Sequence, residues 1–130
     1  MNKRVTGIGG IFIRVNDPQK LGQWYAKHLG IELEPEGDTS VFRWRYRDNP
    51  EQKGATVWAL FAPDSDYLGS KSAPFMLNYR VEDLDAVLEM LKQEGVQVEM
   101  EPITNPHGRF AWIRDPEGHR IELWQAPEDY

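Results

Sequence analysis

An internal repeat constrains the fold of this chain more than any other feature of its sequence. Residues 11–35 are matched a second time by residues 77–102. The clearest anchor is the segment Arg14-Val15-Asn16-Asp17, which corresponds to Arg80-Val81-Glu82-Asp83. Two later landmarks follow at similar spacing: Phe42-Arg43-Trp44 corresponds to Phe110-Ala111-Trp112, and residues 54–63 correspond to residues 118–127. The repeat predicts two modules, residues 6–63 and 74–127, joined by a connector at residues 64–73.

Each module is predicted to be a β-α-β-β-β unit. In both copies an alternating strand ends at the valine, an acidic residue caps a helix, and a glycine introduces a second strand, at residues 30–34 and 95–99. A third and a fourth strand follow, and in the second module Asp115 to Gly118 form the turn between them. We therefore expect one α+β domain over residues 1–130. Its helices cover one face of a curved, mostly antiparallel, eight-stranded sheet, whose other face is covered or hollow.

Composition excludes several classes of partner and cofactor. The formal net charge of -6 disfavours binding to nucleic acid or to an anionic membrane. The chain has no cysteine, which removes disulfides, thiolate metal ligands and cysteine nucleophiles from consideration. No apolar run is long enough for a membrane span or a secretory leader. These features predict a soluble protein of the cytoplasm.

Two motifs resemble the vicinal oxygen chelate superfamily, which includes glyoxalases, bleomycin resistance proteins and extradiol dioxygenases. One is the strand that ends in Val-x-Asp before a helix, present at Val15 and again at Val81. The other is the hairpin from Asp115 to Leu123, Asp-Pro-Glu-Gly-His-Arg-Ile-Glu-Leu. The resemblance covers residues 7–126. It implies a sheet curled around a central cavity and, in many members, a divalent metal that chelates vicinal oxygens of a substrate.

The resemblance also implies where four metal ligands would stand. Those positions fall on Gly10, Trp58, Met76 and Glu122. Glycine has no ligating side chain, an indole nitrogen has a proton and no free lone pair, and a thioether is a weak, soft ligand. Glu122 alone suits a hard cation, whereas catalytic metals need about three protein ligands. His28, His107 and His119 are not spaced as paired ligands. We therefore predict no metal and no cofactor.

Strand alternation predicts which side chains line the cavity, because residues in step with the ligand positions face the same side. The predicted ligand-binding set is Phe12, Arg14, Trp58, Met76, Asn78, Arg80, Arg120 and Trp124. The opposite set is largely apolar and suits packing under helices: Ile11, Ile13, Val15, Leu77, Tyr79 and Val81. A filled core is the alternative to an open pocket.

Arg14 stands where glyoxalase-type members often bind a substrate carboxylate. The alternative role of Arg14 is an ion pair with Glu122 or another acid. Four aromatic residues are not assigned to either face of the sheet: Phe42, Trp44, Phe110 and Trp112.

Three functions agree with this pattern. The first is metal-independent binding or sequestration of a small, partly aromatic molecule, as in bleomycin resistance proteins. The second is a glyoxalase-like lyase, isomerase or dioxygenase in which Glu122 is the remaining acid or base. The third is a structural or interaction domain with a filled core. The resemblance also implies a homodimer, in which the connector, Asp64 to Ala73, permits the modules to be exchanged.

Overall fold

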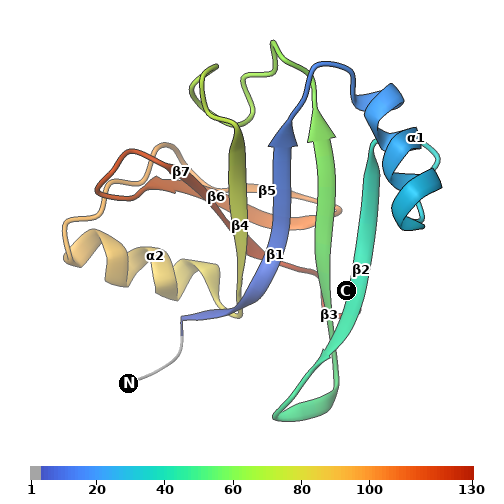
Figure 1. Ribbon diagram of the computed structural model, residues 1–130. Coiled ribbons are helices and arrows are strands. Elements are labelled where there is room, and N and C mark those ends of the chain that lie inside the picture. The colour runs from blue at the N-terminus through green and yellow to red at the C-terminus, as the bar shows by residue number, and fades with distance from the viewer. Residues whose placement is uncertain (1–3) are drawn as a thin grey trace. The chain divides into compact units, whose positions relative to one another are not determined.

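A computed structural model describes residues 4–130, which form two helices and seven strands (Figure 1). In chain order these are β1 (Val5–Arg14), α1 (Pro18–Leu29), β2 (Thr39–Tyr46), β3 (Asn49–Phe61), β4 (Phe75–Val81), α2 (Leu84–Gln93), β5 (Ile103–Asn105), β6 (Gly108–Arg114) and β7 (Arg120–Gln125). The strands belong to one mixed sheet in the order β2-β3-β1-β4-β7-β6-β5. Within the described residues this order has two edges, so the sheet is not closed. The α+β class is confirmed.

The prediction of eight strands is wrong, because the second strand of each predicted module does not form where the sequence placed it. Residues 31–34 form no strand. They lie between Gly30, which ends α1 in the left-handed conformation, and Pro35, which has no N–H to donate to a neighbouring strand. In the second module only Val98 pairs with Ile113, as an isolated bridge. The short strand β5 forms instead beyond Pro102.

The helix starts agree with the sequence. Asp17 caps α1 by accepting a hydrogen bond from the N–H of Lys20 at 3.1 Å, and Asp83 caps α2 by accepting one from Ala86 at 3.1 Å. Helix α2 buries Leu84, Val87 and Leu88, as its periodicity predicts. Helix α1 differs: its one buried residue is Gly22, and Leu29 is 62% exposed.

The contacts divide the chain into two compact units. The N-terminal unit, residues 10–76, contains α1, the strands β2 and β3, the second half of β1 and the first residues of β4. Here β1 pairs with β3 in parallel, and β2 pairs with β3 antiparallel. The C-terminal unit combines residues 4–9 with residues 77–130. In it β4 pairs with β7 in parallel, while β6 pairs antiparallel with both β7 and β5.

The core of the C-terminal unit separates the two faces of its strands. Val81, Ala111 and Leu123 pack with the buried residues of α2, and Tyr79 and Ile121 pack against this cluster. Figure 1 shows α2 beside the strands of this unit. The alternation of β4 and β7 then turns Asn78, Arg80, Glu122 and Trp124 to the opposite face. The predicted phase of these two strands is therefore confirmed.

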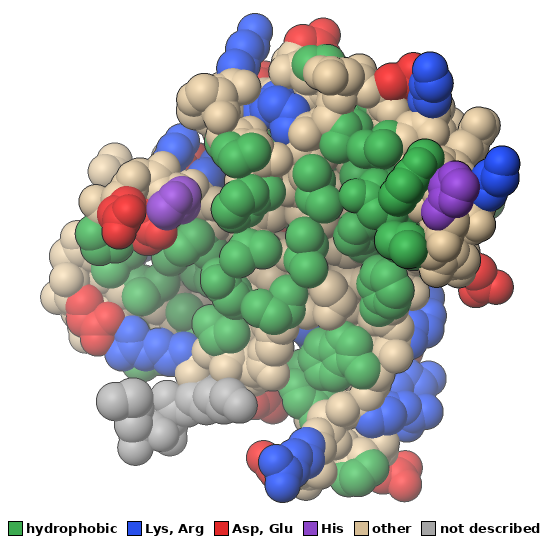
Figure 2. Space-filling model, in the orientation of Figure 1, with side chains coloured by type: hydrophobic (Ala, Val, Ile, Leu, Met, Phe, Trp, Pro, Cys, Tyr) green, Lys and Arg blue, Asp and Glu red, His purple; other side chains and the backbone are tan. Residues whose placement is uncertain are grey.

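Apolar side chains also remain at the surface, and Figure 2 shows hydrophobic groups among the charged ones on the visible face. In the C-terminal unit the exposed apolar residues include Val5, Ile8, Met100 and Ile103. In the N-terminal unit they include Ile11, Trp24, Leu29, Phe42 and Phe75. Neither helix is long and apolar enough to cross a membrane, as judged over residues 4–130.

Candidate functional site

The central feature of the C-terminal unit is the buried carboxylate of Glu122, which is 1% exposed. Its Oε1 accepts a hydrogen bond from Asn78 Nδ2 at 2.5 Å, and its Oε2 accepts one from Trp112 Nε1 at 2.9 Å. Strand register brings these groups together, because Glu122 lies opposite Asn78 on β4 and opposite Trp112 on β6. Side chains that are paired across a sheet point to the same face. Each carboxylate oxygen therefore has a fixed N–H donor.

Asn78 presents its other amide atom, Oδ1, toward Gly9. This oxygen is buried and has no hydrogen-bond partner among residues 4–130. A Cβ atom at Gly9 would overlap Asn78 Oδ1 and would lie 2.9 Å from both Arg80 Cγ and Trp124 Cε3. Glycine at this position therefore lets β1 approach the polar face of β4 and β7 more closely than any residue with a side chain could.

Arg80 and Trp124 form a layered stack beside this cluster. The Arg80 guanidinium carbon lies 5.0 Å from the centre of the Trp124 ring, and Phe110 stacks on Trp124 with a centroid distance of 6.1 Å and an interplanar angle of 6°. Trp124 Nε1 donates to the backbone oxygen of His107 at 2.8 Å. Arg80 Nη2 donates to the backbone oxygen of Tyr130 at 2.7 Å, and the Tyr130 ring meets the Trp124 ring edge-on at 5.7 Å. The ring of Trp124 is thus fixed on several sides.

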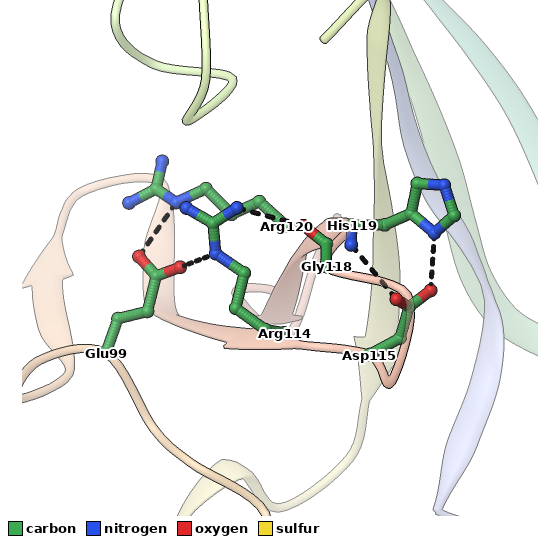
Figure 3. Close-up of polar contacts among 6 residues, drawn as sticks. All are labelled: Glu99, Arg114, Asp115, Gly118, His119 and Arg120. Atoms are coloured by element: carbon green, nitrogen blue, oxygen red, sulfur yellow. Dashed lines mark hydrogen bonds and ion pairs between the residues drawn. The ribbon is translucent and has the colours of Figure 1, made fainter.

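Glu99, which precedes β5, contacts two arginines of the β6–β7 hairpin, Arg114 and Arg120 (Figure 3). Glu99 accepts hydrogen bonds from Arg114 Nε at 2.6 Å and from Arg120 Nε at 3.0 Å. Burial alone would raise the pKa of Glu99, but the two guanidinium groups together hold it below its ordinary value. Arg120 also lies 5.2 Å from the centre of the Trp112 ring, the same ring that donates to Glu122. Arg120 is therefore engaged by Glu99 and Trp112.

The turn of this hairpin is closed by Asp115, which Figure 3 shows beside His119. Asp115 Oδ1 accepts from the backbone N–H groups of Glu117 and His119, and its Oδ2 lies 2.7 Å from His119 Nδ1. The backbone hydrogen bond from His119, followed by the contact with its ring, lowers the pKa of Asp115. These contacts give the Asp-Pro-Glu-Gly-His segment a structural role in setting the register of β6 and β7, and so in placing Trp112 opposite Glu122.

In the N-terminal unit the predicted lining residues Phe12, Trp58 and Met76 are all buried. Trp58 meets Tyr25 of α1 edge-on at 5.0 Å between ring centres. Phe12 lies 5.5 Å from Phe61, and Phe61 stacks on Tyr67 of the connector at 5.4 Å. On β2, Trp44 Nε1 donates to Thr56 at 2.9 Å, and its ring covers Gly54, where a Cβ would overlap it. Aromatic rings therefore contact one another within this unit, beside buried aliphatic residues such as Leu60 and Leu68.

Arg14 also belongs to the N-terminal unit, and its guanidinium binds the connector. Nε donates to the backbone oxygen of Ala73 at 2.9 Å, and Nη2 donates to that of Ser70 at 3.0 Å. Nη1 donates to the backbone oxygens of Pro63 and Ser65 at 3.0 and 2.7 Å, with Ala62 at 3.5 Å. These contacts differ from the ion pair with an acid that was one of the two roles considered from the sequence. Recognition of a ligand carboxylate by Arg14 stays a prediction. Arg14 holds both ends of the connector through backbone carbonyl groups.

The side chains at the four family metal positions do not fit a metal. Gly10, Trp58 and Met76 supply no hard ligand, and both oxygens of Glu122 accept hydrogen bonds from nitrogen donors. A ligating carboxylate would instead direct at least one oxygen to the ion. Within residues 4–130 no three His, Asp or Glu side chains are grouped as metal ligands.

The structure thus brings together only part of the predicted set within one unit. Asn78, Arg80, Arg120, Trp124 and Glu122 form a contiguous polar and aromatic cluster in the C-terminal unit. Four further residues contact this cluster and were not predicted from the sequence: Trp112, Gly9, Glu99 and Tyr130. For Trp112 a signal was present: the turn centred on residue 117 pairs position 112 with position 122. Nothing in the sequence pattern indicates the contact between Arg80 and Tyr130.

Comparison with known proteins identifies the family. Residues 7–123 match the family model described as Glyoxalase/Bleomycin resistance protein/Dioxygenase superfamily. The chain belongs to this superfamily, which confirms the resemblance seen in its motifs.

Individual relatives agree with this assignment. The chain is 33% identical over 100 residues to a Mycobacterium bovis protein named "Putative glyoxylase CFP32". The match covers 68% of this chain and 38% of that protein, which is well under half of the relative's length. A protein of Synechocystis named "Probable lactoylglutathione lyase" is 29% identical over 121 residues, covering 88% of this chain and 91% of that one. Methylmalonyl-CoA epimerase from Mycobacterium tuberculosis has a similar structure, with a TM-score of 0.62, 23% identity, and coverage of 98% and 92% of the two chains. This last likeness concerns the fold alone.

Proposed function

We propose that this protein binds a small, partly aromatic molecule without a metal. The proposal rests on the hydrogen bonding of Glu122, which is the one hard ligand at the metal positions that the family resemblance gives. Its two oxygens are already held by Asn78 and Trp112. Sequestration of a ligand needs only a shaped and chemically selective surface, whereas the metal chemistry of the superfamily needs a set of hard ligands.

The residues around Glu122 support an aromatic ligand. Trp124, Phe110 and Trp112 provide flat apolar surfaces, and Arg80 and Arg120 provide planar cations beside them. Such a combination recognises planar molecules that carry negative charge, since an arginine binds oxygen anions and an aromatic ring stacks on a flat ligand. In the N-terminal unit Trp58 and Phe12 offer the same kind of surface.

A titration of planar aromatic acids in the presence of EDTA tests this proposal. We expect at least one acid to bind with an affinity that EDTA does not change. Replacing Trp124 by alanine is expected to weaken that binding by about tenfold, because a lost stacking contact and its buried area amount to roughly 1.4 kcal/mol or more. Trp24→Ala is the matched control, because Trp24 is 50% exposed on α1. Binding that requires an added divalent metal would contradict the proposal.

A lyase or isomerase reaction with Glu122 as acid or base is the second candidate. The names of two relatives, a glyoxylase and a lactoylglutathione lyase, and the burial of the carboxylate favour it. For proton transfer a substrate would have to reach one oxygen of Glu122 in place of Asn78 or Trp112. Turnover of a bound ligand that Glu122→Gln abolishes while binding persists would favour this candidate over sequestration.

We also infer that the protein forms a homodimer. Exposed apolar side chains in each unit support this inference, since surface apolar groups commonly mark interfaces. They include Ile8 in the C-terminal unit, and Ile11 and Phe75 in the N-terminal unit. Light scattering at tens of micromolar protein is expected to give twice the mass of the chain, which is 15.1 kDa. The mass of a single chain at that concentration would contradict it.

A further inference from the structure

We propose that the β2–β3 hairpin carries a binding site for a diphosphate group, formed by Arg43, Arg45 and Lys53 on one face of its strands. The site goes beyond the proposed function, because it shares no residue with the cluster around Glu122 and belongs to the N-terminal unit. Figure 2 shows basic side chains gathered at the edge of the view where β2 lies in Figure 1.

Strand register places the three cations on the same face of the hairpin. Arg45 lies directly opposite Lys53, and Arg43 lies two residues before Arg45 on β2. Side chains that are two residues apart along a strand, or paired across two strands, point to the same side of the sheet. All three residues are exposed. Their side chains therefore start from positions roughly 5–7 Å apart on one surface.

This arrangement is unfavourable for the protein without a bound anion. Like charges directly opposite each other on antiparallel strands destabilise a sheet. Within residues 4–130 neither Arg45 nor Lys53 forms an ion pair, and Arg45 Nη1 donates to the backbone oxygen of Pro50 at 3.2 Å. A multivalent anion between Arg45 and Lys53 would convert this repulsion into two attractive contacts.

The acids of the hairpin stand outside the regular strand pairing. Asp48 lies in the turn, and Glu51 lies in the segment 50–52, where the register shifts between the pairs Arg45–Lys53 and Tyr46–Asn49. Residues 43–53 hold four basic and two acidic side chains, whereas the whole chain has a net charge of -6. The hairpin is therefore a basic region of an acidic protein.

The opposite face of the hairpin fixes the strands that carry the cations. Trp44 Nε1 donates to Thr56 at 2.9 Å, and the Trp44 ring covers Gly54. The Tyr46 ring meets the Trp44 ring edge-on at 4.9 Å. Regular strands position side chains more precisely than loops do. Binding therefore has to order the long basic side chains but not the backbone that carries them.

The spacing suits two linked phosphoryl groups better than one. A guanidinium binds phosphate oxygens through paired N–H donors, and an ammonium group adds a point charge. Arg45 and Lys53 would hold one phosphoryl group between them, and Arg43, one step along the same face of β2, would contact the next. A single carboxylate would neutralise only one of the three cations. The ligand class is therefore a diphosphate, either free or part of a nucleoside diphosphate.

Calorimetric titration with inorganic diphosphate, in metal-free buffer of low ionic strength, tests the proposal. Arg45→Gln and Lys53→Gln should each weaken binding by at least about fivefold, because each removes a charged hydrogen-bond donor to phosphate. Lys20→Gln, at an exposed position of α1 in the same unit, is the matched control. It removes the same charge and should change the affinity by less than about twofold, since charges far apart on the surface are screened. Inorganic phosphate should bind at least about tenfold more weakly than diphosphate.

Thermal unfolding gives a readout that a merely structural role would not produce. Without an anion, Lys53→Gln should unfold at a temperature about 2 °C above that of the wild type, because the like-charge pair is gone. Diphosphate should raise the unfolding temperature of the wild type and leave that of Lys53→Gln nearly unchanged. The same substitution thus stabilises the free protein and removes the stabilisation by the ligand.

ADP distinguishes the two sources of the diphosphate group. Equal affinities for ADP and inorganic diphosphate would assign recognition to the phosphoryl groups alone, and tighter binding of ADP would add a contact with the nucleoside. In both cases Arg45→Gln should weaken binding. Equal weakening by Lys20→Gln and Lys53→Gln would show general attraction of anions and would overturn the proposal. No binding of diphosphate at low ionic strength, or an affinity unchanged in both hairpin variants, would overturn it as well.

Discussion

Replacing Glu122 by alanine is expected to lower the free energy of unfolding by about 2–4 kcal/mol. The substitution leaves Asn78 Nδ2 and Trp112 Nε1 without their acceptor in a region where all three side chains are at most 4% exposed. Each unsatisfied buried donor costs about 1–3 kcal/mol, and the cavity left by the side chain adds to this loss. Removal of a buried charge offsets part of it. The expected net effect is a large fraction of the stability of a domain of this size.

Urea unfolding followed by circular dichroism measures this effect. Glu117→Ala is the matched control, because Glu117 lies exposed in the turn of the same hairpin. Glu122→Gln should fall between the control and the alanine variant, since an amide keeps the shape but has one acceptor oxygen for two N–H donors. A change below about 0.5 kcal/mol in Glu122→Ala, the range of an ordinary surface substitution, would show that the three side chains do not act as one buried group.

Replacing Arg14 by alanine is expected to loosen the connector and to lower the free energy of unfolding by about 2–3 kcal/mol. The guanidinium joins backbone oxygens at the start of the connector, at Pro63 and Ser65, to those near its end, at Ser70 and Ala73. A hydrogen bond from a charged donor contributes about 1.5–3 kcal/mol, but exposed carbonyl groups regain hydrogen bonds with water when the donor is lost. The total is therefore far below the sum over all contacts.

Limited proteolysis gives the second readout for Arg14. Cleavage within residues 64–73 should become faster in Arg14→Ala and should stay slow in Arg47→Ala, an exposed arginine of the same unit. Arg14→Lys should recover only a minor part of the loss, because an ammonium group is a point charge that cannot reach carbonyl groups on opposite sides as a planar fork does. An unchanged cleavage pattern combined with a weakened affinity for an aromatic acid would assign Arg14 to ligand recognition instead.

Much of the fold could be predicted because its signals are local. The caps at Asp17 and Asp83, the turn from Asp115 to Gly118 and the periodicity of α2 each depend on a few neighbouring residues. The two second strands failed because residues 30–34 and 95–99 carry strand-like alternation but lie between a left-handed glycine and a proline. Pairing with a neighbour decides whether such a short segment becomes a strand, and sequence alternation does not supply that information.

The candidate site was predictable to the extent that strand phase determines it. Alternation placed Asn78, Arg80, Glu122 and Trp124 on the face of the C-terminal unit opposite α2. Trp112 was left unassigned because a shift of one residue in the hairpin would turn it to the other face. The partners of Arg14 and Arg80 are backbone oxygens in irregular segments. Since every residue has such an oxygen, no residue type marks these contacts in a sequence.

Three of the four positions that the family resemblance gives for metal ligands hold no hard ligand in this chain. Around the fourth, Glu122, there are hydrogen-bond donors. Where a metal would neutralise the carboxylate, Asn78 and Trp112 supply N–H donors to both oxygens of Glu122. A buried carboxylate is costly unless its hydrogen-bonding capacity is satisfied, so retention of glutamate without a metal requires such partners. The donors therefore account for how the residue persists in the core, and they support binding without a metal.

Elemental analysis tests this central claim most directly. The protein is incubated with zinc, manganese, nickel and cobalt, passed through a desalting column, and its metal content is measured beside that of Glu122→Ala. We expect less than about 0.1 equivalent of any of these metals per chain in both proteins, because one carboxylate without further hard ligands does not retain a divalent ion. About one equivalent of metal in the wild type that is lost in Glu122→Ala would contradict the account and would restore Glu122 as a metal ligand.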